Sequence, residues 1–126
     1  MRIDHVALNV KEPRLMAQWY VANLDMSFIR SSDEPPYVHM LVSADGGAMI
    51  ELYANPVGEF LDYGSMHSLT FHIAIVTDDL VKDRDRLVAA GAKVDSDIMV
   101  NPSGYQMAVI RDPWGHGLQL VQAPEE

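Results

Sequence analysis

The chain has 126 residues, no cysteine and a formal net charge of −9. This length fits one domain with one core, and the lack of cysteine excludes disulfides and thiolate metal sites. The negative charge argues against nucleic acid and anionic membranes as partners. No apolar run approaches the roughly 18 residues of a membrane span. The first residues also lack the apolar core of a signal peptide, so we expect a cytoplasmic protein.

The first half of the chain predicts one strand, one helix and three further strands. The first strand covers about residues 2–9, and Glu12-Pro13 opens the helix, because proline is tolerated in the first helical turn. The helix is predicted to end near Leu24-Asp25 and to bury Trp19, on a stripe made by Leu15, Trp19, Tyr20 and Ala22. Turn signals then separate three short strands near 26–31, 37–43 and 47–54.

The second half of the chain repeats this order after a linker. The linker runs from Asn55 to Met66, and a strand follows at about 68–76. Asp78 or Asp79 can cap the next helix and Gly91 can stop it, with Leu80, Leu87 and Val88 as its apolar face. Three strands near 93–99, 105–111 and 117–122 close the unit. We therefore expect one domain, 1–126, made of two modules at about 1–56 and 66–122.

Two pairs of segments show that the halves are related. The strand around His5 is similar to the strand around His72, an offset of 72 − 5 = 67 residues. The strand around Glu51 is similar to the strand around Gln119, an offset of 119 − 51 = 68 residues. Two separate segments with nearly the same offset indicate a duplicated unit. The predicted fold class is α+β, with two βαβββ units.

Strand alternation places a polar side chain opposite the aliphatic face in four strands. Side chains along a strand point to alternate faces, so each of these polar residues leaves the face that packs on the helix. Each unit thus offers one imidazole and one oxygen-bearing side chain on the same face of its sheet. The four residues His5, Glu51, His72 and Gln119 make a reasonable set of ligands for a borderline divalent ion.

Other polar and aromatic residues have less definite roles. Tyr53 and Met49 share a face with Glu51, and together with Tyr105 they are expected either to line the substrate cleft or to pack in the core. His116 follows a glycine in a turn and is expected to be exposed, whereas the parity of His39 allows either face. Arg2, Arg14 and Arg30 are scattered, so they form no cluster that would mark a carboxylate-binding site.

Three motifs resemble the glyoxalase, bleomycin-resistance and dioxygenase superfamily, also called vicinal oxygen chelate proteins. The motifs cover nearly the whole chain and are Ile3-Asp4-His5-Val6-Ala7-Leu8, the helix end Trp19-Tyr20-Val21-Ala22-Asn23-Leu24-Asp25-Met26, and Arg111-Asp112-Pro113-Trp114-Gly115-His116-Gly117-Leu118-Gln119-Leu120. The resemblance implies a curved mixed sheet, shaped as a cup or partial barrel, with the helices outside. It is specific for the fold and does not name the reaction.

The resemblance also implies a site. Metal-binding members take ligands from the first and fourth strands of both units, which correspond here to His5, Glu51, His72 and Gln119. The metal ion that the resemblance implies is Ni, Zn, Co, Mn or Fe. Many members of the superfamily are homodimers. The pattern is most similar to glyoxalase I but departs from it at Gln119, where the family usually has Glu. An amide cannot act as a base, so Glu51 is the candidate for both ligand and base.

Three functions from different classes follow from the resemblance. The first is a metal-dependent lyase or isomerase that acts on a small substrate with vicinal oxygens through a metal-stabilised enediolate. The second is a metal-free protein that binds a small molecule, similar to the bleomycin-resistance members. Gln119 favours the second function, whereas the retention of both His5 and His72 argues against it. The third is an extradiol dioxygenase, in which Glu51 would have to replace the carboxylate expected on the last strand.

Overall fold

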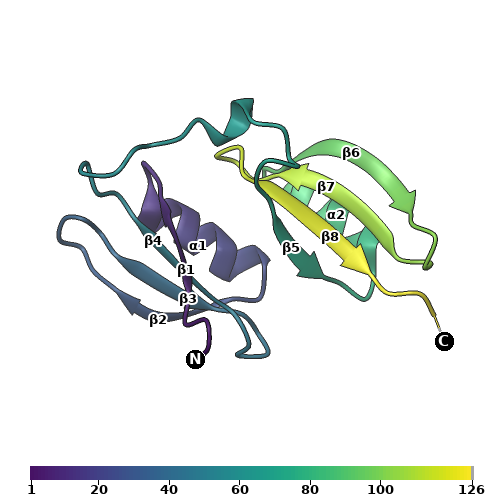
Figure 1. Ribbon diagram of the computed structural model, residues 1–126, viewed down its shortest axis with the longest axis horizontal. Helices are drawn as coiled ribbons and strands as arrows, with labels where there is room; N and C mark the ends of the chain where they lie inside the picture. Colours follow the sequence, from purple (N-terminus) through teal and green to yellow (C-terminus); the bar gives the residue numbers. More distant parts are fainter. Residues whose placement is uncertain (126) are drawn as a thin grey trace. The chain divides into compact units, whose positions relative to one another are not determined.

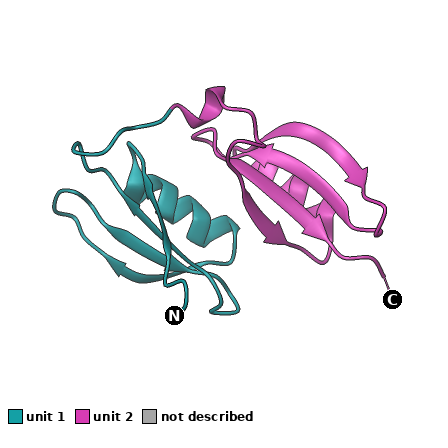
Figure 2. Cartoon of the chain, viewed as in Figure 1, with its two compact units in different colours: residues 1–61 teal, residues 62–126 magenta. Residues whose placement is uncertain are grey.

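The computed structural model describes residues 1–125, and the chain divides into two compact units, Met1–Leu61 and Asp62–Glu126 (Figure 2). Unit 1 contains, in order, β1 (Val6–Asn9), α1 (Pro13–Asn23), β2 (Ser27–Ser31), β3 (His39–Val42) and β4 (Met49–Tyr53). Its sheet has the order β1-β4-β3-β2, with β1 parallel to β4 and the other pairs antiparallel. The helix packs on β3 and β4 (Figure 1).

Unit 2 repeats this arrangement after a short 3-10 helix, η1 (Tyr63–Ser65). Its elements are β5 (Ile73–Val76), α2 (Leu80–Ala89), β6 (Lys93–Val100), β7 (Gln106–Arg111) and β8 (Gly117–Gln122), and the sheet order is β5-β8-β7-β6. The expected α+β fold of two βαβββ units is therefore confirmed. The strands form two separate four-stranded mixed sheets, and neither sheet is closed. In the part of the chain that the structure describes, no helix is long and apolar enough to cross a membrane.

The two sheets also share their register and their irregularities. Ala7 on β1 lies opposite Glu51 on β4, and Ala74 on β5 lies opposite Gln119 on β8. The outer strands β2 and β6 each carry a bulge, between Phe28 and Arg30 in one and starting between Val94 and Ser96 in the other. A bulge bends and twists its strand locally. Its presence at the same place in both units adds to the likeness of the two sheets.

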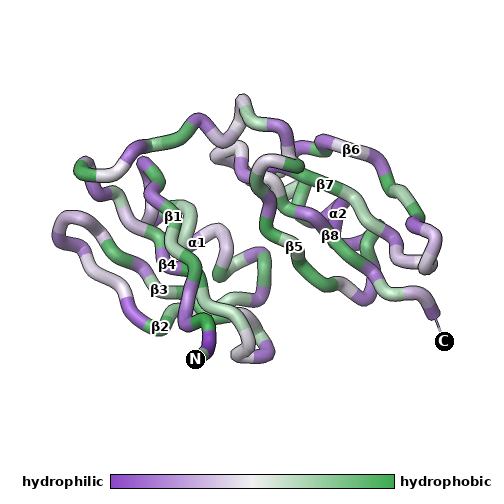
Figure 3. The backbone as a smooth tube through the Cα atoms, in the orientation of Figure 1, coloured by the Kyte–Doolittle hydropathy of each residue, from purple (hydrophilic) through white to green (hydrophobic). Residues whose placement is uncertain are grey.

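The alternation of the strands separates a helix face from a polar face. Leu118 and Leu120 are buried in the core of unit 2, while Gln119 between them is only half-buried. Figure 3 shows β5 and β7 among the most hydrophobic segments of this unit. The strands that carry the histidines are shorter than predicted. β1 begins at Val6 and β5 at Ile73, so His5 and His72 each stand just before a strand.

Helix α1 buries a different stripe from the predicted one. Pro13, as expected, occupies the first turn. The residues that face the sheet are Pro13, Met16, Ala17 and Tyr20, whereas Leu15 is 47% exposed, Trp19 is half-buried and Ala22 is exposed. The buried set has the i, i+3, i+4, i+7 spacing of a helix face. The helix thus carries two apolar stripes, and the sheet of unit 1 covers only one of them.

Helix α2 begins and ends as the sequence predicts, and one of the three residues predicted for its apolar face is not packed. The Asp79 side chain accepts a hydrogen bond from the backbone N–H of Lys82, which caps the helix. Gly91 follows the last turn with a φ of 113°, a conformation that favours glycine. Leu80 and Leu87 are buried, but Val88 is 39% exposed and lies outside the packed face.

His116 is buried, which corrects the expectation that it is exposed. Only 2% of its surface is accessible, and its Nδ1 lies 3.0 and 3.1 Å from the two carboxylate oxygens of Asp112. The Tyr63 ring covers it with a centroid distance of 4.3 Å. Asp112 also accepts hydrogen bonds from the backbone N–H groups of Trp114 and His116. The turn before β8 is thus a packed part of unit 2.

Replacing Gly115 by alanine should destabilise the fold more than the same change at Gly46. Both glycines have a positive φ, 92° and 77°. A Cβ at Gly115 would lie 2.7 Å from the Cα of Gly64, whereas a Cβ at Gly46 would meet nothing within 4 Å. We expect Gly115→Ala to lower the free energy of unfolding by about 2–4 kcal/mol and Gly46→Ala by about 1 kcal/mol. Urea unfolding of both variants measures the difference, and equal losses would contradict a steric role for Gly115.

Candidate functional site

In unit 1, Glu51 and His5 stand together at the polar face of the sheet. The Glu51 side chain is 15% exposed, and its Oε2 lies 3.8 Å from Nε2 of His5. Arg30 brings its Nη2 to 3.6 Å from the same oxygen. Arg30 lies opposite Met40, and Met40 lies opposite Glu51. Register across three strands therefore places a cation, an imidazole and a carboxylate at one point.

The His5 ring is oriented by its neighbour Asp4. His5 Nδ1 lies 2.8 Å from the Asp4 carboxylate, and this hydrogen bond holds the pKa of Asp4 below its usual value. An ionised carboxylate can only accept a hydrogen bond, so Nδ1 carries the proton. The lone pair of the neutral ring is then on Nε2, the nitrogen nearer to Glu51.

In unit 2, His72 is oriented in the same way by the backbone. Its Nδ1 lies 2.8 Å from the carbonyl oxygen of Ser68. A carbonyl also only accepts, so Nδ1 of His72 is protonated and Nε2 has the free lone pair. Gly117 leaves room for this ring, because a Cβ at position 117 would lie 3.3 Å from Cβ of His72 and 3.2 Å from the carbonyl oxygen of Phe71. The strand that carries Gln119 begins at this glycine.

One histidine in each unit has the hydrogen bond that is typical of a metal-binding histidine. Metal-binding histidines usually donate one ring N–H to a carboxylate or a carbonyl, which fixes the ring and frees the other nitrogen. His5 and His72 do this with Asp4 and Ser68. Each unit contributes two of the four predicted ligands, and within residues 1–125 no group of three or more His, Asp or Glu side chains stands together as a metal site. The donor set of two imidazoles, a carboxylate and an amide oxygen fits a borderline ion.

The predicted substrate-binding residues occupy the same faces. Met49 and Tyr53 alternate with Ile50 and Leu52 on β4, which places them on the face of Glu51. Tyr105 precedes β7 and is 39% exposed. Its neighbours on that face, Met107 and Val109, are opposite Val121 and Gln119.

Sequence reasoning missed three residues around the site. Asp4 was recognisable, because it stands next to His5 in the chain. Ser68 acts through its backbone carbonyl, which any residue type could supply. Arg30 was set aside as one of the scattered arginines, and its approach to Glu51 depends on the β2 bulge.

Comparison of the sequence with known proteins identifies a family and several relatives. A sequence model described as the Glyoxalase/Bleomycin resistance protein/Dioxygenase superfamily matches residues 2–120. The chain is similar to the lactoylglutathione lyase of Salmonella typhimurium, with 28% identity over 131 residues that cover 99% of this chain and 95% of that protein. It is also similar to the lactoylglutathione lyase of Haemophilus influenzae, with 26% identity, 97% of this chain and 93% of that protein.

Solved structures share the fold at lower identity. The chain is similar to a glyoxalase family protein from Bacillus cereus, with a TM-score of 0.82, 18% identity, and coverage of 99% and 95% of the two chains. It is similar as well to an antibiotic binding protein from Streptomyces sp. CB03234, with a TM-score of 0.69, 20% identity and 98% coverage of each chain. One backbone arrangement therefore serves both a glyoxalase family protein and an antibiotic binding protein.

Proposed function

The chain belongs to the glyoxalase/bleomycin resistance protein/dioxygenase superfamily, and from that membership we propose that it is a metal-dependent lyase or isomerase of the glyoxalase type. Its substrate would be a small molecule with two neighbouring oxygens. The observation that carries the proposal is the matched orientation of two imidazoles. Both His5 and His72 use Nδ1 in a hydrogen bond to an oxygen acceptor and keep the Nε2 lone pair for a ligand.

The residues that would hold the ion are His5, Glu51, His72 and Gln119. The mixed nitrogen and oxygen donors are suited to Ni, Zn, Co, Mn or Fe. A divalent ion held there supplies a Lewis acid for the two substrate oxygens. The proposal treats both units as one functional domain of a cytoplasmic homodimer, with Met49, Tyr53 and Tyr105 lining the substrate cleft.

Glu51 is proposed as the proton carrier. Its carboxylate would take the proton from the substrate carbon beside a carbonyl, hold it on an Oε atom and return it to the neighbouring carbon. The Arg30 guanidinium lies beside this carboxylate, 3.6 Å from Oε2. Gln119 has no proton to exchange and would act only through its amide oxygen. The two units would thus divide the work, with unit 1 carrying the base.

The names of the curated relatives suggest the first substrate to test. Lactoylglutathione is a thioester of glutathione, and its formation from methylglyoxal and glutathione moves a proton between two adjacent oxygen-bearing carbons. The scattered arginines leave the glutathione part of the substrate without a defined site. A smaller hydroxy-carbonyl compound is therefore tested beside it.

Metal content and turnover together test the proposal. Protein purified without chelator or affinity tag should contain close to one divalent ion per chain by mass spectrometry. Formation of lactoylglutathione should appear on addition of Ni or Co and disappear on addition of a chelator. Predominant Fe or Mn would direct the assays to dioxygenase chemistry with diphenols instead. A chain that holds no metal, and takes up none of Ni, Zn, Mn or Fe(II), would overturn the proposal.

The second candidate is a metal-free protein that binds a small molecule in the same cleft. Gln119 favours it, because the amide removes one negative charge from the predicted ligand set. The paired imidazoles count against it, since a sequestering cleft does not need two histidines with free Nε2 atoms. A thermal-shift screen of small molecules on metal-free protein distinguishes the two candidates.

A further inference from the structure

Unit 1 contains a pocket on the opposite side of its sheet from Glu51. We call it the helix-side pocket. Its volume is about 320 Å³, and it is lined by residues 12–15 at the start of α1 and by Ser32, Asp33, Tyr37 and His39. His39 lies opposite Leu52, which is fully buried, whereas the next residue along β3 lies opposite Glu51. Alternation therefore assigns His39 to the helix side, and the pocket is separate from the proposed metal ligands.

His39 is a buried polar group without a partner. Its surface is 2% exposed, and neither ring nitrogen has a hydrogen-bond partner among residues 1–125. Burial lowers the pKa of His39, the Arg14 guanidinium lowers it further, and Asp33 opposes both. The ring is therefore neutral at pH 7, with one N–H donor and one lone pair. Buried polar atoms in native proteins are nearly always satisfied, so this ring is a marked exception.

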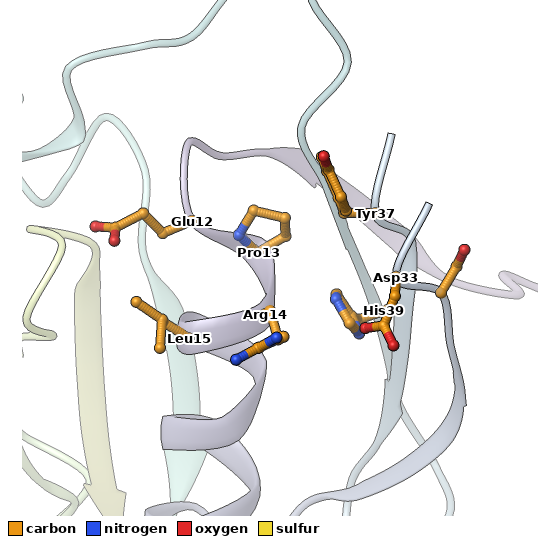
Figure 4. Close-up of a pocket in the computed structure, with 8 residues that line it drawn as sticks. Glu12, Pro13, Arg14, Leu15, Asp33, Tyr37 and His39 are labelled. Carbon is orange, nitrogen blue, oxygen red and sulfur yellow. The ribbon is translucent and has the colours of Figure 1, made fainter. Parts of the chain in front are cut away.

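The ring faces the pocket rather than the core of the unit. Figure 4 shows the His39 ring between the Arg14 side chain on α1 and the Asp33 side chain in the loop between β2 and β3. One ring nitrogen is directed toward the space between Pro13 and Tyr37. Phe28 packs against another edge of the ring, with centroids 6.3 Å apart. Both nitrogens are buried, so a ligand group in this space supplies the missing hydrogen bond only after a covering side chain moves.

The walls of the pocket favour a ring compound without negative charge. Pro13, Leu15 and Tyr37 give apolar surface, and the charged rim has two carboxylates, Glu12 and Asp33, against one guanidinium, so its formal charge is −2 + 1 = −1. Such a rim repels anions. The volume stands at the small end of the range for ligand pockets, about 300–1,000 Å³. This is enough for a single ring.

Tyr37 is fixed in place as one wall. Its φ is 61°, a conformation that costs energy for a bulky aromatic residue. The loop holds it there through its backbone N–H, which donates to the carbonyl of Glu34, and through the bond from Ser32 N–H to the Val38 carbonyl. Its ring is 41% exposed, as is expected for a wall that one side of a ligand would cover.

We propose that the helix-side pocket binds a small uncharged ring compound that carries a hydroxyl group, with the hydroxyl hydrogen-bonded to His39. A hydroxyl both donates and accepts, so it satisfies the ring nitrogen in either tautomer. Both ring nitrogens are buried, so contact requires a covering side chain to move aside, and exposed side chains such as that of Arg14 change rotamer within nanoseconds. This site does not depend on metal binding or on the proposed reaction.

Three matched probes test the proposal by NMR on the uniformly ¹⁵N-labelled full chain. Phenol carries the hydroxyl, toluene has the same shape without it, and benzoate adds a negative charge. Phenol should give saturable shifts at the amides of residues 14, 15, 33 and 39, and toluene should bind roughly threefold to tenfold more weakly, the factor of one neutral hydrogen bond. Benzoate should also bind more weakly than phenol, because the negative rim repels it. Equal binding of phenol and toluene, or shifts spread over the whole surface, would overturn the proposal.

Variants separate His39 from a general apolar effect. His39→Phe keeps a buried ring and removes the nitrogens, so the preference for phenol over toluene should vanish. His5→Ala, on the other face of the sheet, should leave that preference unchanged. If His39→Phe does not fold, Tyr37→Gly removes the wall and suits the positive φ, and all three probes should then bind more weakly. A preference for phenol that survives His39→Phe, or binding that survives Tyr37→Gly, contradicts the site.

Discussion

Replacing His72 by alanine should reduce the bound divalent metal from close to one per chain to less than about a tenth. The change removes a nitrogen ligand together with its orienting bond to the Ser68 carbonyl. Loss of an outer-shell partner alone weakens metal binding about 10–100-fold, so loss of the ligand should weaken it by at least about 100-fold. Mass spectrometry after gel filtration in chelator-free buffer measures the ratio of metal to protein.

His67→Ala is the matched control for this experiment. His67 is exposed, lies five positions before His72 in the chain, and accepts a hydrogen bond from the Leu69 backbone N–H. Its loss removes an imidazole from the same segment without touching the predicted ligands. Metal content should stay at the wild-type ratio. If both variants lost metal equally, or if His72→Ala kept its metal, the predicted ligand set would be wrong.

Replacing Glu51 by glutamine should lower kcat/KM for isomerisation about 100- to 10,000-fold, the range that a general base contributes. The amide keeps the shape and an oxygen ligand but cannot accept the proton. Metal content is measured on the same sample, because a loss of metal would explain inactivity without any role as a base. Glu59→Gln, an exposed carboxylate in the same unit, should leave the rate unchanged.

The duplication permits a sharper version of this test. The double variant Glu51→Gln, Gln119→Glu exchanges the carboxylate and the amide between two positions that occupy equivalent register in β4 and β8. It keeps the net charge and the set of donor types. We expect it to recover activity to within about tenfold of the wild type, since either unit can present the base. Full activity in the single variant Glu51→Gln would rule out Glu51 as the base.

The fold was predictable because the same pattern of strands and helix occurs twice in the sequence. The common offset of His5 with His72 and of Glu51 with Gln119 indicated the repeat, and alternation in β8 placed Gln119 on the face away from the buried leucines. Strand ends were less predictable, because they depend on pairing with a distant strand. The strands β1 and β5 begin after the histidines for this reason.

The errors have one physical origin, which is packing between distant segments. Helix α1 offers two apolar stripes, and only the position of the sheet selects the one that contains Tyr20 over the one that contains Trp19. His116 follows a turn glycine, a position that is usually exposed, yet Tyr63 covers it from another part of unit 2. The Arg30 contact with Glu51 depends on an extra residue in β2.

The paired bulges also change the edges of the two sheets. β2 and β6 are the outer strands of their sheets, and an unpaired strand edge is a template for another chain. β6 carries exposed apolar side chains at Met99 and Val100, which would favour such intermolecular pairing. A bulge interrupts the regular row of backbone donors and acceptors and twists the edge away. The irregularity that brings Arg30 to the site therefore also breaks up an edge that another chain would need for regular pairing.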